Sequence, residues 1–185
     1  MSRVIAEAAA LETGTPLGAV RLMASEAGLC GLWFMDQTDL AEPGVAEASP
    51  QQQRWLVQAA GQLKAWFAGE RRDFDLPLAP QGTPFQRKVW DGLLALPFGT
   101  TVGYGELARR LGQPGAARAL AQAVGRNPIS IIIPCHRVIG SDTSLTGFGG
   151  GLARKRELLL HEGNRYSSQA ARARRVNDGQ MDLPW

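Results

Sequence analysis

Two short helical segments joined through a glycine restrict the fold of this chain more than any other feature. The first is YGELARRLG, residues 104–112, in which the leucines share one face and Gly112 ends the helix. The second is QPGAARALAQAVG, residues 113–125, in which Pro114 suits the first helical position and Gly125 falls just past the last turn. Two helices joined so closely predict a helix-turn-helix motif.

The second helix of such a motif is the one that would read DNA. It is rich in alanine, and only Arg118 and Gln122 carry groups that could hydrogen-bond the edges of bases. A transcriptional regulator that recognises one DNA sequence is therefore a poor fit, and no effector domain is evident.

A further helix should begin just before this motif. Thr83 can cap it, with Pro84 in the first turn and Gln86 placed to return the capping bond. The segment before it, residues 71–82, contains prolines that exclude a helix, so we expect an extended link between two lobes.

The first third of the chain alternates short apolar runs with turn residues, which predicts a small antiparallel sheet. Its strands are expected at residues 3–11, 17–25 and 28–36. Helical spacing of apolar residues from 51 to 70 predicts a helix that covers the sheet. The expected fold class is α/β, of the α+β kind, in three parts: a sheet-and-helix domain at 1–80, a mainly helical domain at 81–165 and a basic tail at 166–185.

The apolar run ISIIIP, residues 129–134, predicts a buried strand that delivers Cys135 at its end, where side chains emerge from a rigid support. A thiol becomes a good nucleophile once it loses its proton, and His136 follows directly. Adjacent residues of an extended segment point to opposite faces, so a water would have to bridge the two side chains. The dipeptide alone leaves two interpretations open, a catalytic cysteine and a buried structural thiol.

The other cysteine, Cys30, stands in an apolar strand and is expected to be a buried thiol. A disulfide is the less expected use of the pair, because thiols stay reduced in the cytoplasm. The two histidines, His136 and His161, lack the paired spacing with the cysteines that a zinc site requires. The sequence therefore predicts no metal and no cofactor.

Charge is unevenly distributed along the chain, although the formal net charge is only +3. Acidic residues crowd the first fifty positions and arginines crowd the second half, which suits a partner that bears phosphate groups. A solvated basic surface would look the same, so charge alone leaves both interpretations open. No apolar run approaches the roughly 20 residues of a membrane span, and no signal sequence is evident, so we expect a cytoplasmic protein.

Residues 84–163 resemble the O6-alkylguanine-DNA alkyltransferases almost from end to end. The likeness includes PCHRV at 134–138, RAL at 118–120 and LLLHEG at 158–163. The strand-rich first third resembles the more variable N-terminal lobe of that family. The resemblance implies a DNA repair protein that transfers an alkyl group from O6 of guanine, and also from O4 of thymine, to its own cysteine in one irreversible step.

The resemblance also implies roles for individual residues. Cys135 would accept the alkyl group, His136 would remove the thiol proton through a water, and Glu162 would orient His136. Asn127 would brace the turn before the cysteine segment. Tyr104 would crowd a target phosphate and donate a proton toward N3 of the leaving guanine.

The implied partner is double-stranded DNA that contains alkylated guanine, bound through the minor groove by a monomer. O6 of a paired guanine lies inside the duplex, so the base must be flipped out, and Arg118 would take its place in the stack. Ala117 and Gln122 would also face the DNA. Small side chains let this helix approach closely without reading the sequence.

The base would be held by the carbonyls of Cys135 and Val138 and by a glycine-rich loop. The implied loop residues are Phe148, Gly149 and Gly150. The family usually has glycine where this chain has Thr143 and tyrosine where it has Phe148. We therefore expect an altered loop geometry or an altered preference for the alkyl group.

One alternative is a non-catalytic protein that binds damaged DNA, like the alkyltransferase-like proteins. These have another residue, often tryptophan, at the acceptor position, so Cys135 argues against this alternative. A thiol hydrolase is the weakest alternative, because no motif for an oxyanion site is present.

Overall fold

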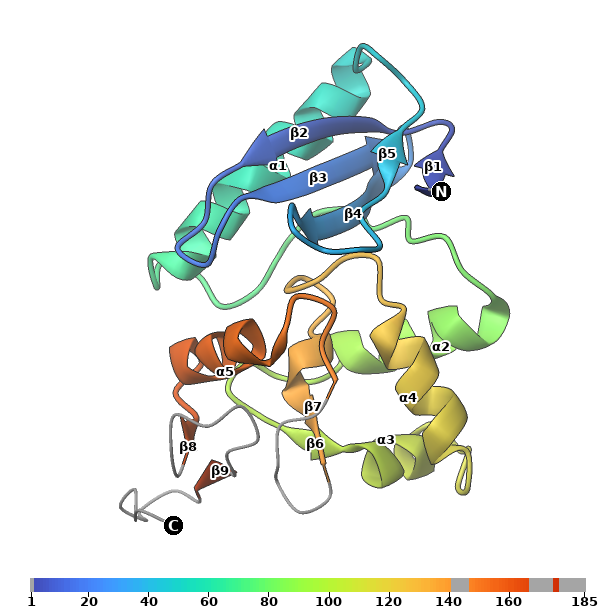
Figure 1. The fold of residues 1–185 in the computed structure, drawn as a ribbon, viewed down its shortest axis with the longest axis vertical. Helices are drawn as coiled ribbons and strands as arrows, with labels where there is room; N and C mark the ends of the chain where they lie inside the picture. Colours follow the sequence, from blue (N-terminus) through green and yellow to red (C-terminus); the bar gives the residue numbers. More distant parts are fainter. Residues whose placement is uncertain (1, 141–146, 167–174, 177–185) are drawn as a thin grey trace. The chain divides into compact units, whose positions relative to one another are not determined.

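The computed structural model describes residues 2–140, 147–166 and 175–176, and the chain forms two compact units (Figure 1). The first unit consists of Met1–Gln81 and Pro128–Ile132, and the second of Gly82–Asn127 and Ile133–Trp185. The chain therefore leaves the second unit after Asn127 and returns to it just before Cys135.

A three-stranded antiparallel sheet forms the centre of the first unit, in the order β2-β3-β4. Its strands are β2 (Ala9–Thr13), β3 (Val20–Ser25) and β4 (Gly28–Phe34). A short parallel pair, β1 (Val4–Ile5) with β5 (Glu42–Pro43), accompanies it. Helix α1 (Pro50–Phe67) runs along one face of the sheet and buries Leu56, Leu63 and Trp66 there (Figure 1). The predicted antiparallel sheet and its covering helix are confirmed.

Strand β4 binds the chain segment that precedes Cys135 in the sequence. All of its residues are buried, and the backbone of Leu32 bonds to the segment that follows Asn127. The amide of Leu32 donates to the carbonyl of Pro128 at 2.8 Å, and the amide of Ser130 donates to the carbonyl of Leu32 at 3.1 Å. These bonds satisfy buried backbone groups that would otherwise destabilise the fold, so residues 128–132 are firmly held.

Helices dominate the second unit (Figure 1). They are α2 (Pro84–Leu94), α3 (Tyr104–Arg110), α4 (Ala117–Gly125), the 3-10 helix η1 (Cys135–Arg137) and α5 (Leu152–His161). Two short pairs of strands complete it: β6 (Val102–Gly103) parallel to β7 (Val138–Ile139), and β8 (Arg165–Tyr166) antiparallel to β9 (Arg175–Val176). The predicted capping box of α2 is confirmed, since Thr83 and Gln86 each accept from the other's backbone amide. The mainly helical lobe and its helix-turn-helix are confirmed too.

Two predictions about the ends of α4 are wrong. Helix α4 begins at Ala117, so Pro114 lies in the turn before it, and Gly125 is its last residue. The late start of α4 is explained by Gly115, whose left-handed φ of +89° does not fit a right-handed helix.

The run at residues 129–134 is buried as predicted, but it is not a strand. Only Ile129 makes a bridge to the sheet, and Ile131 turns the chain with a φ of +72°. That conformation is costly for a β-branched residue, so tertiary contacts must impose it. Cys135 and His136 consequently lie on the 3-10 helix η1 and do not alternate as neighbours on a strand would.

Within the described residues, no helix is both long enough and apolar enough to cross a membrane. Most of the tail predicted at 166–185, and Thr143, lie outside the described residues.

Candidate active site

Cys135 is the first residue of η1 and is only 6% exposed. Burial raises the pKa of its thiol, while a side-chain hydrogen bond with Asn127, the charge of Lys155 and the backbone amides of Cys135 and His136 lower it. The raised pKa keeps the resting thiol protonated, and the opposing groups stabilise the thiolate once a base has removed the proton.

Asn127 braces the turn that leads to the cysteine. Its Nδ2 donates to the carbonyl of Ile133 at 2.8 Å, and its side chain is 7% exposed. The same side chain bonds to the thiol, so one amide fixes both the backbone before Cys135 and the position of the sulfur.

His136 and Glu162 form a buried pair next to this thiol. His136 Nε2 lies 2.7 Å from Glu162 Oε2, and both side chains are fully buried. Burial lowers the pKa of His136, Glu162 opposes this, and the charges of Arg137 and Lys155 add to the lowering. The imidazole is therefore neutral at neutral pH. Because Nε2 is engaged by the carboxylate, Nδ1 is the nitrogen that can accept a proton.

Arg137 also contacts the carboxylate of Glu162. Its Nε donates to Oε1 at 2.5 Å and to Oε2 at 3.1 Å, and the amide of Gly99 donates to Oε1 at 3.3 Å. Burial would raise the pKa of Glu162, but the hydrogen bond with His136 and then the charge and hydrogen bond of Arg137 lower it. Glu162 is therefore an ionised carboxylate inside the protein.

Lys155 is a site residue that the sequence interpretation missed. Its side chain is completely buried, and Nζ donates to the carbonyl of Val138 at 2.5 Å and to that of Gly147 at 3.4 Å. Burial lowers its pKa to about 8, while the charge of Cys135 raises it. The spacing of Leu152, Lys155 and Leu159 on one helical face could have indicated an inward position.

Tyr104 is placed by the pairing of β6 with β7, which aligns Gly103 with Ile139 just after the cysteine segment. The tyrosine begins α3, and its hydroxyl lies 3.8 Å from the position that a Cβ on Gly147 would take. Gly147 has a φ of +41° and opens the loop predicted to line the base pocket. Tyr104 therefore approaches Gly147, the loop residue whose carbonyl accepts from Lys155.

The predicted loop residues lie just before α5. The carbonyl of Phe148 accepts from the amide of Gly151 at 2.9 Å, and the carbonyl of Gly150 accepts from Arg154 at 3.2 Å. Gly149 is exposed at the tip of this turn. The start of the loop is tied to the buried Lys155, and its end to the first turn of α5.

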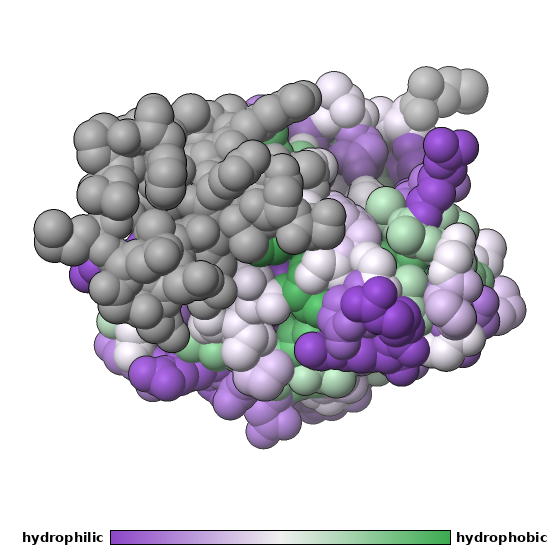
Figure 2. All heavy atoms as spheres, turned by 90° about the horizontal axis from the view of Figure 1, so that it is seen from below, coloured by the Kyte–Doolittle hydropathy of each residue, from purple (hydrophilic) through white to green (hydrophobic). Residues whose placement is uncertain are grey.

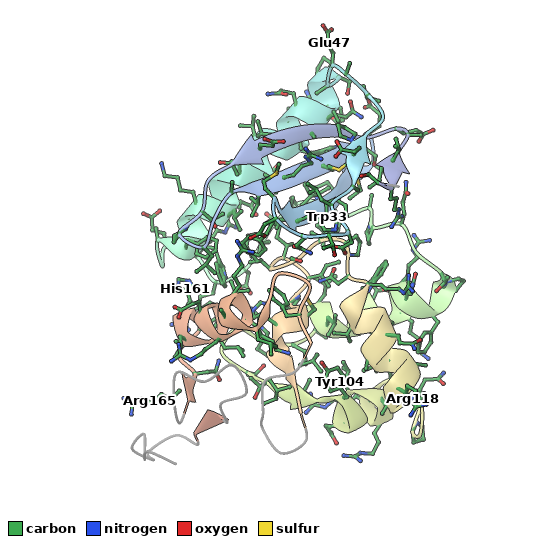
Figure 3. The ribbon with its side chains drawn as sticks, viewed as in Figure 1. Trp33, Glu47, Tyr104, Arg118, His161 and Arg165 are labelled. Atoms are coloured by element: carbon green, nitrogen blue, oxygen red, sulfur yellow. The ribbon has the colours of Figure 1, made fainter. Side chains whose placement is uncertain are left out.

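The residues predicted to face DNA lie on α4. Arg118 and Gln122 are exposed and Ala117 is half-buried, while Leu120, Ala123 and Val124 face inward. Figure 3 shows Arg118 on α4 and Tyr104 at the start of α3, on neighbouring helices of the second unit. Seen from below, the described surface shows apolar residues between hydrophilic ones (Figure 2).

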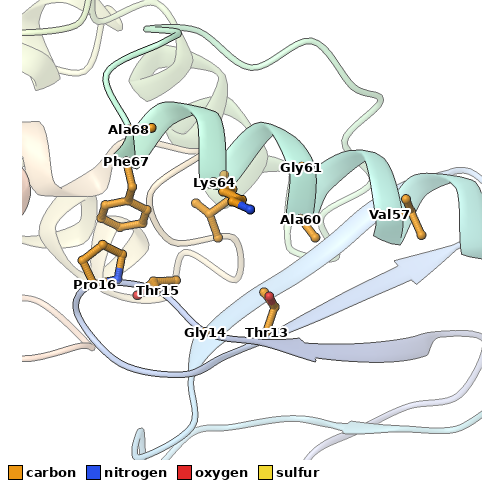
Figure 4. Close-up of a pocket in the computed structure, with 11 residues that line it drawn as sticks. Thr13, Gly14, Thr15, Pro16, Val57, Ala60, Gly61, Lys64, Phe67 and Ala68 are labelled. Carbon is orange, nitrogen blue, oxygen red and sulfur yellow. The ribbon is translucent and has the colours of Figure 1, made fainter.

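A separate pocket of about 710 Å³ lies in the first unit, between α1 and the turn after β2 (Figure 4). Val57, Lys64 and Phe67 of α1 line it together with Pro16 of the turn. Its lining includes none of the predicted site residues and no cysteine or histidine.

The chain is similar to known proteins across both units. Two family models match it: the DNA-binding domain of 6-O-methylguanine DNA methyltransferase over residues 84–164, and the ribonuclease-like domain of the same family over residues 13–80. The methylated-DNA–protein-cysteine methyltransferase of Mycobacterium tuberculosis is 46% identical over 151 residues, which cover 82% of this chain and 90% of the relative.

A relative of the same name from Methanosarcina acetivorans is 44% identical over 150 residues, which cover 81% of this chain and 95% of the relative. Among solved structures, Mycobacterium tuberculosis OGT in complex with DNA matches with a TM-score of 0.71 and 44% identity. That match covers 82% of this chain and 90% of the solved one.

Proposed function

This chain belongs to the 6-O-methylguanine DNA methyltransferase family, and we propose that it moves alkyl groups from O6 of guanine in double-stranded DNA onto Cys135. Membership makes it a DNA repair methyltransferase with a protein cysteine as acceptor. The observation that carries the proposal is a buried thiol followed by a neutral imidazole, which an ionised carboxylate holds. O4 of alkylated thymine is a second substrate, because its alkyl group sits on the same kind of exocyclic ring oxygen. The protein acts as a monomer.

Removal of the thiol proton is the first step. His136 accepts the proton at Nδ1 through a water, and Glu162 stabilises the imidazolium that forms. Asn127, two backbone amides and Lys155 stabilise the resulting thiolate.

The sulfur then attacks the alkyl carbon. A carbon–sulfur bond forms as the carbon–oxygen bond breaks, and the electron pair of the broken bond stays on the guanine. Tyr104 donates a proton toward N3, which neutralises the leaving base. The imidazolium returns its proton to solvent and Tyr104 regains one, so the products are an unmodified guanine and a thioether at Cys135.

DNA has to present the base outside the helix, because O6 of a paired guanine lies within the stack. Helix α4 exposes Arg118 and Gln122 among small side chains, which suits close approach in the minor groove without reading of sequence. Arg118 fills the gap that the flipped base leaves. The carbonyl of Val138 and the loop at Phe148, Gly149 and Gly150 hold the flipped base.

Each molecule should act once, because a thioether has no good leaving group for water to displace. Excess duplex containing O6-methylguanine should therefore lose one methyl group per protein, and the intact mass of the protein should rise by one methyl. Quantifying residual O6-methylguanine against protein concentration measures this stoichiometry. A plateau well above one would show that the protein turns over, and an unchanged mass would favour a damage-binding protein without transfer.

Arg118→Ala should slow repair of duplex DNA much more than reaction with free O6-benzylguanine. The arginine supports the extruded state and takes no part in bond making, so the duplex reaction should fall roughly tenfold or more. Arg54→Ala, which removes an exposed arginine from α1, is the matched control and should leave both rates near wild type. Equal losses on the two substrates in Arg118→Ala would assign this arginine another role.

A further inference from the structure

We propose that Arg137 is a positioning residue for alkyl transfer: it fixes the Glu162 carboxylate and keeps His136 neutral, ready to take the thiol proton. This inference rests on the proposed function, in which His136 is the base. It adds a fixed cation to the buried pair described above.

The contacts of Arg137 hold the guanidinium in one place. Besides its two contacts with Glu162, its Nη1 donates to the carbonyl of Leu96 at 2.6 Å, and its Cζ lies 5.9 Å from the centroid of the Phe98 ring. The side chain is 9% exposed. A planar guanidinium with partners on two sides cannot rotate without breaking a charge-assisted hydrogen bond.

This arrangement fixes the carboxylate as well. Oε1 of Glu162 accepts from Arg137 and from the amide of Gly99, while Oε2 has the longer contact with Arg137 at 3.1 Å and the shorter one with His136 at 2.7 Å. The orientation of the carboxylate determines which ring nitrogen of the histidine it engages. Arg137 therefore holds Nε2 on Glu162 and Nδ1 available for the proton, although it touches neither the thiol nor the substrate.

The charge of Arg137 matters as much as its position. A buried carboxylate beside a histidine favours the imidazolium, which could no longer accept a proton from Cys135. Arginine stays cationic at any relevant pH, so Glu162 remains ionised without drawing a proton onto His136. Among the described residues, the other charged or titratable groups that act near His136 are Cys135 on η1 and Lys155 on α5. Helix α2, which also packs against η1, turns its apolar residues inward: Val89, Trp90 and Leu93.

The test is the pH dependence of the reaction between the full-length protein and free O6-benzylguanine, from pH 5 to 9. In the wild type, the rate should fall at acidic pH, where His136 becomes protonated. In Arg137→Met the carboxylate loses its fixed cation and the Glu162–His136 pair takes up its proton at higher pH. The acid limb should therefore move upward by roughly one pH unit or more. Arg137→Lys keeps the positive charge but cannot hold Glu162 and the carbonyl of Leu96 together as the guanidinium does. The acid limb of its pH profile should therefore stay near that of the wild type while its rate falls.

Arg21→Met is the matched control, because Arg21 also bridges carboxylates, Glu12 at 2.9 Å and Glu42 at 3.0 Å, in the first unit. It should lower the melting temperature without moving the pH profile.

An Arg137→Met protein that reacts more slowly at every pH, with the acid limb of its pH profile in the wild-type position, would overturn the inference. If that variant does not fold, Arg137→Lys decides: a reaction rate equal to that of the wild type would overturn the inference. An NMR spectrum that shows Nδ1 protonated and Nε2 bare in the wild type would also overturn it. A wild type that reacts with neither O6-benzylguanine nor methylated DNA would instead refute the proposed function.

Discussion

Replacing Cys135 with serine should abolish alkyl transfer and leave binding to DNA nearly unchanged. The serine hydroxyl is similar in size but far less acidic than the thiol, so a neutral imidazole cannot generate an effective nucleophile from it. The groups that stabilise a thiolate, among them Asn127 and Lys155, would remain in place around an unreactive hydroxyl. Intact mass after incubation with methylated duplex measures transfer, and fluorescence anisotropy with the same duplex measures binding.

Cys30→Ala is the control for this experiment. Burial raises the pKa of the Cys30 thiol to about 11, and the residue is 1% exposed within the core of the first unit, so it should not serve as an acceptor. Cys30→Ala should still gain one methyl group. Methylation of Cys135→Ser would assign the acceptor to another residue.

Local signals in the sequence predicted the start of α2 and the end of α3 well. The exchange of bonds between Thr83 and Gln86 involves residues three apart, so their spacing alone determines it. The same holds for Gly112, which follows α3 with a φ of +70°. Such features depend on neighbours along the chain, and no knowledge of the fold is needed to find them.

Long-range pairing explains what the sequence could not predict. The run before Cys135 is apolar enough for a strand, yet Leu32, almost a hundred residues earlier, bonds to the backbone only at Pro128 and Ser130, and Ile131 then turns the chain in a left-handed conformation. Within the second unit, the sequence gives no sign that Lys155 and Arg137 differ from the other basic residues, most of which are exposed in proteins. Only the folded structure shows that both are buried and directed at the groups around Cys135.

Glu162→Gln should both destabilise the protein and nearly eliminate transfer. The amide has the shape of the carboxylate but no charge, so Arg137 is left as a buried cation without its partner. Removing one member of a buried ion pair costs about 3–5 kcal/mol, which corresponds to a fall of roughly 10 °C in melting temperature for a protein of this size. Transfer should fall because the imidazolium also loses the negative charge that stabilises it. Differential scanning calorimetry and single-turnover kinetics with methylated duplex measure the two effects.

The pH dependence of the lost stability distinguishes the loss of an ion pair from a simple packing effect. The pKa of Glu162 lies below its ordinary value because His136 and Arg137 favour the carboxylate. A carboxyl group whose pKa is lower in the folded than in the unfolded protein stabilises the native state at pH values above its unfolded pKa. This stabilisation is lost as the pH falls through its folded pKa. The gap in melting temperature between wild type and Glu162→Gln should therefore narrow below about pH 4. Glu157→Gln, the same substitution at an exposed position of α5, should change neither melting temperature nor rate. A gap that stayed constant down to acid pH would mean that Glu162 is not ionised in the folded protein.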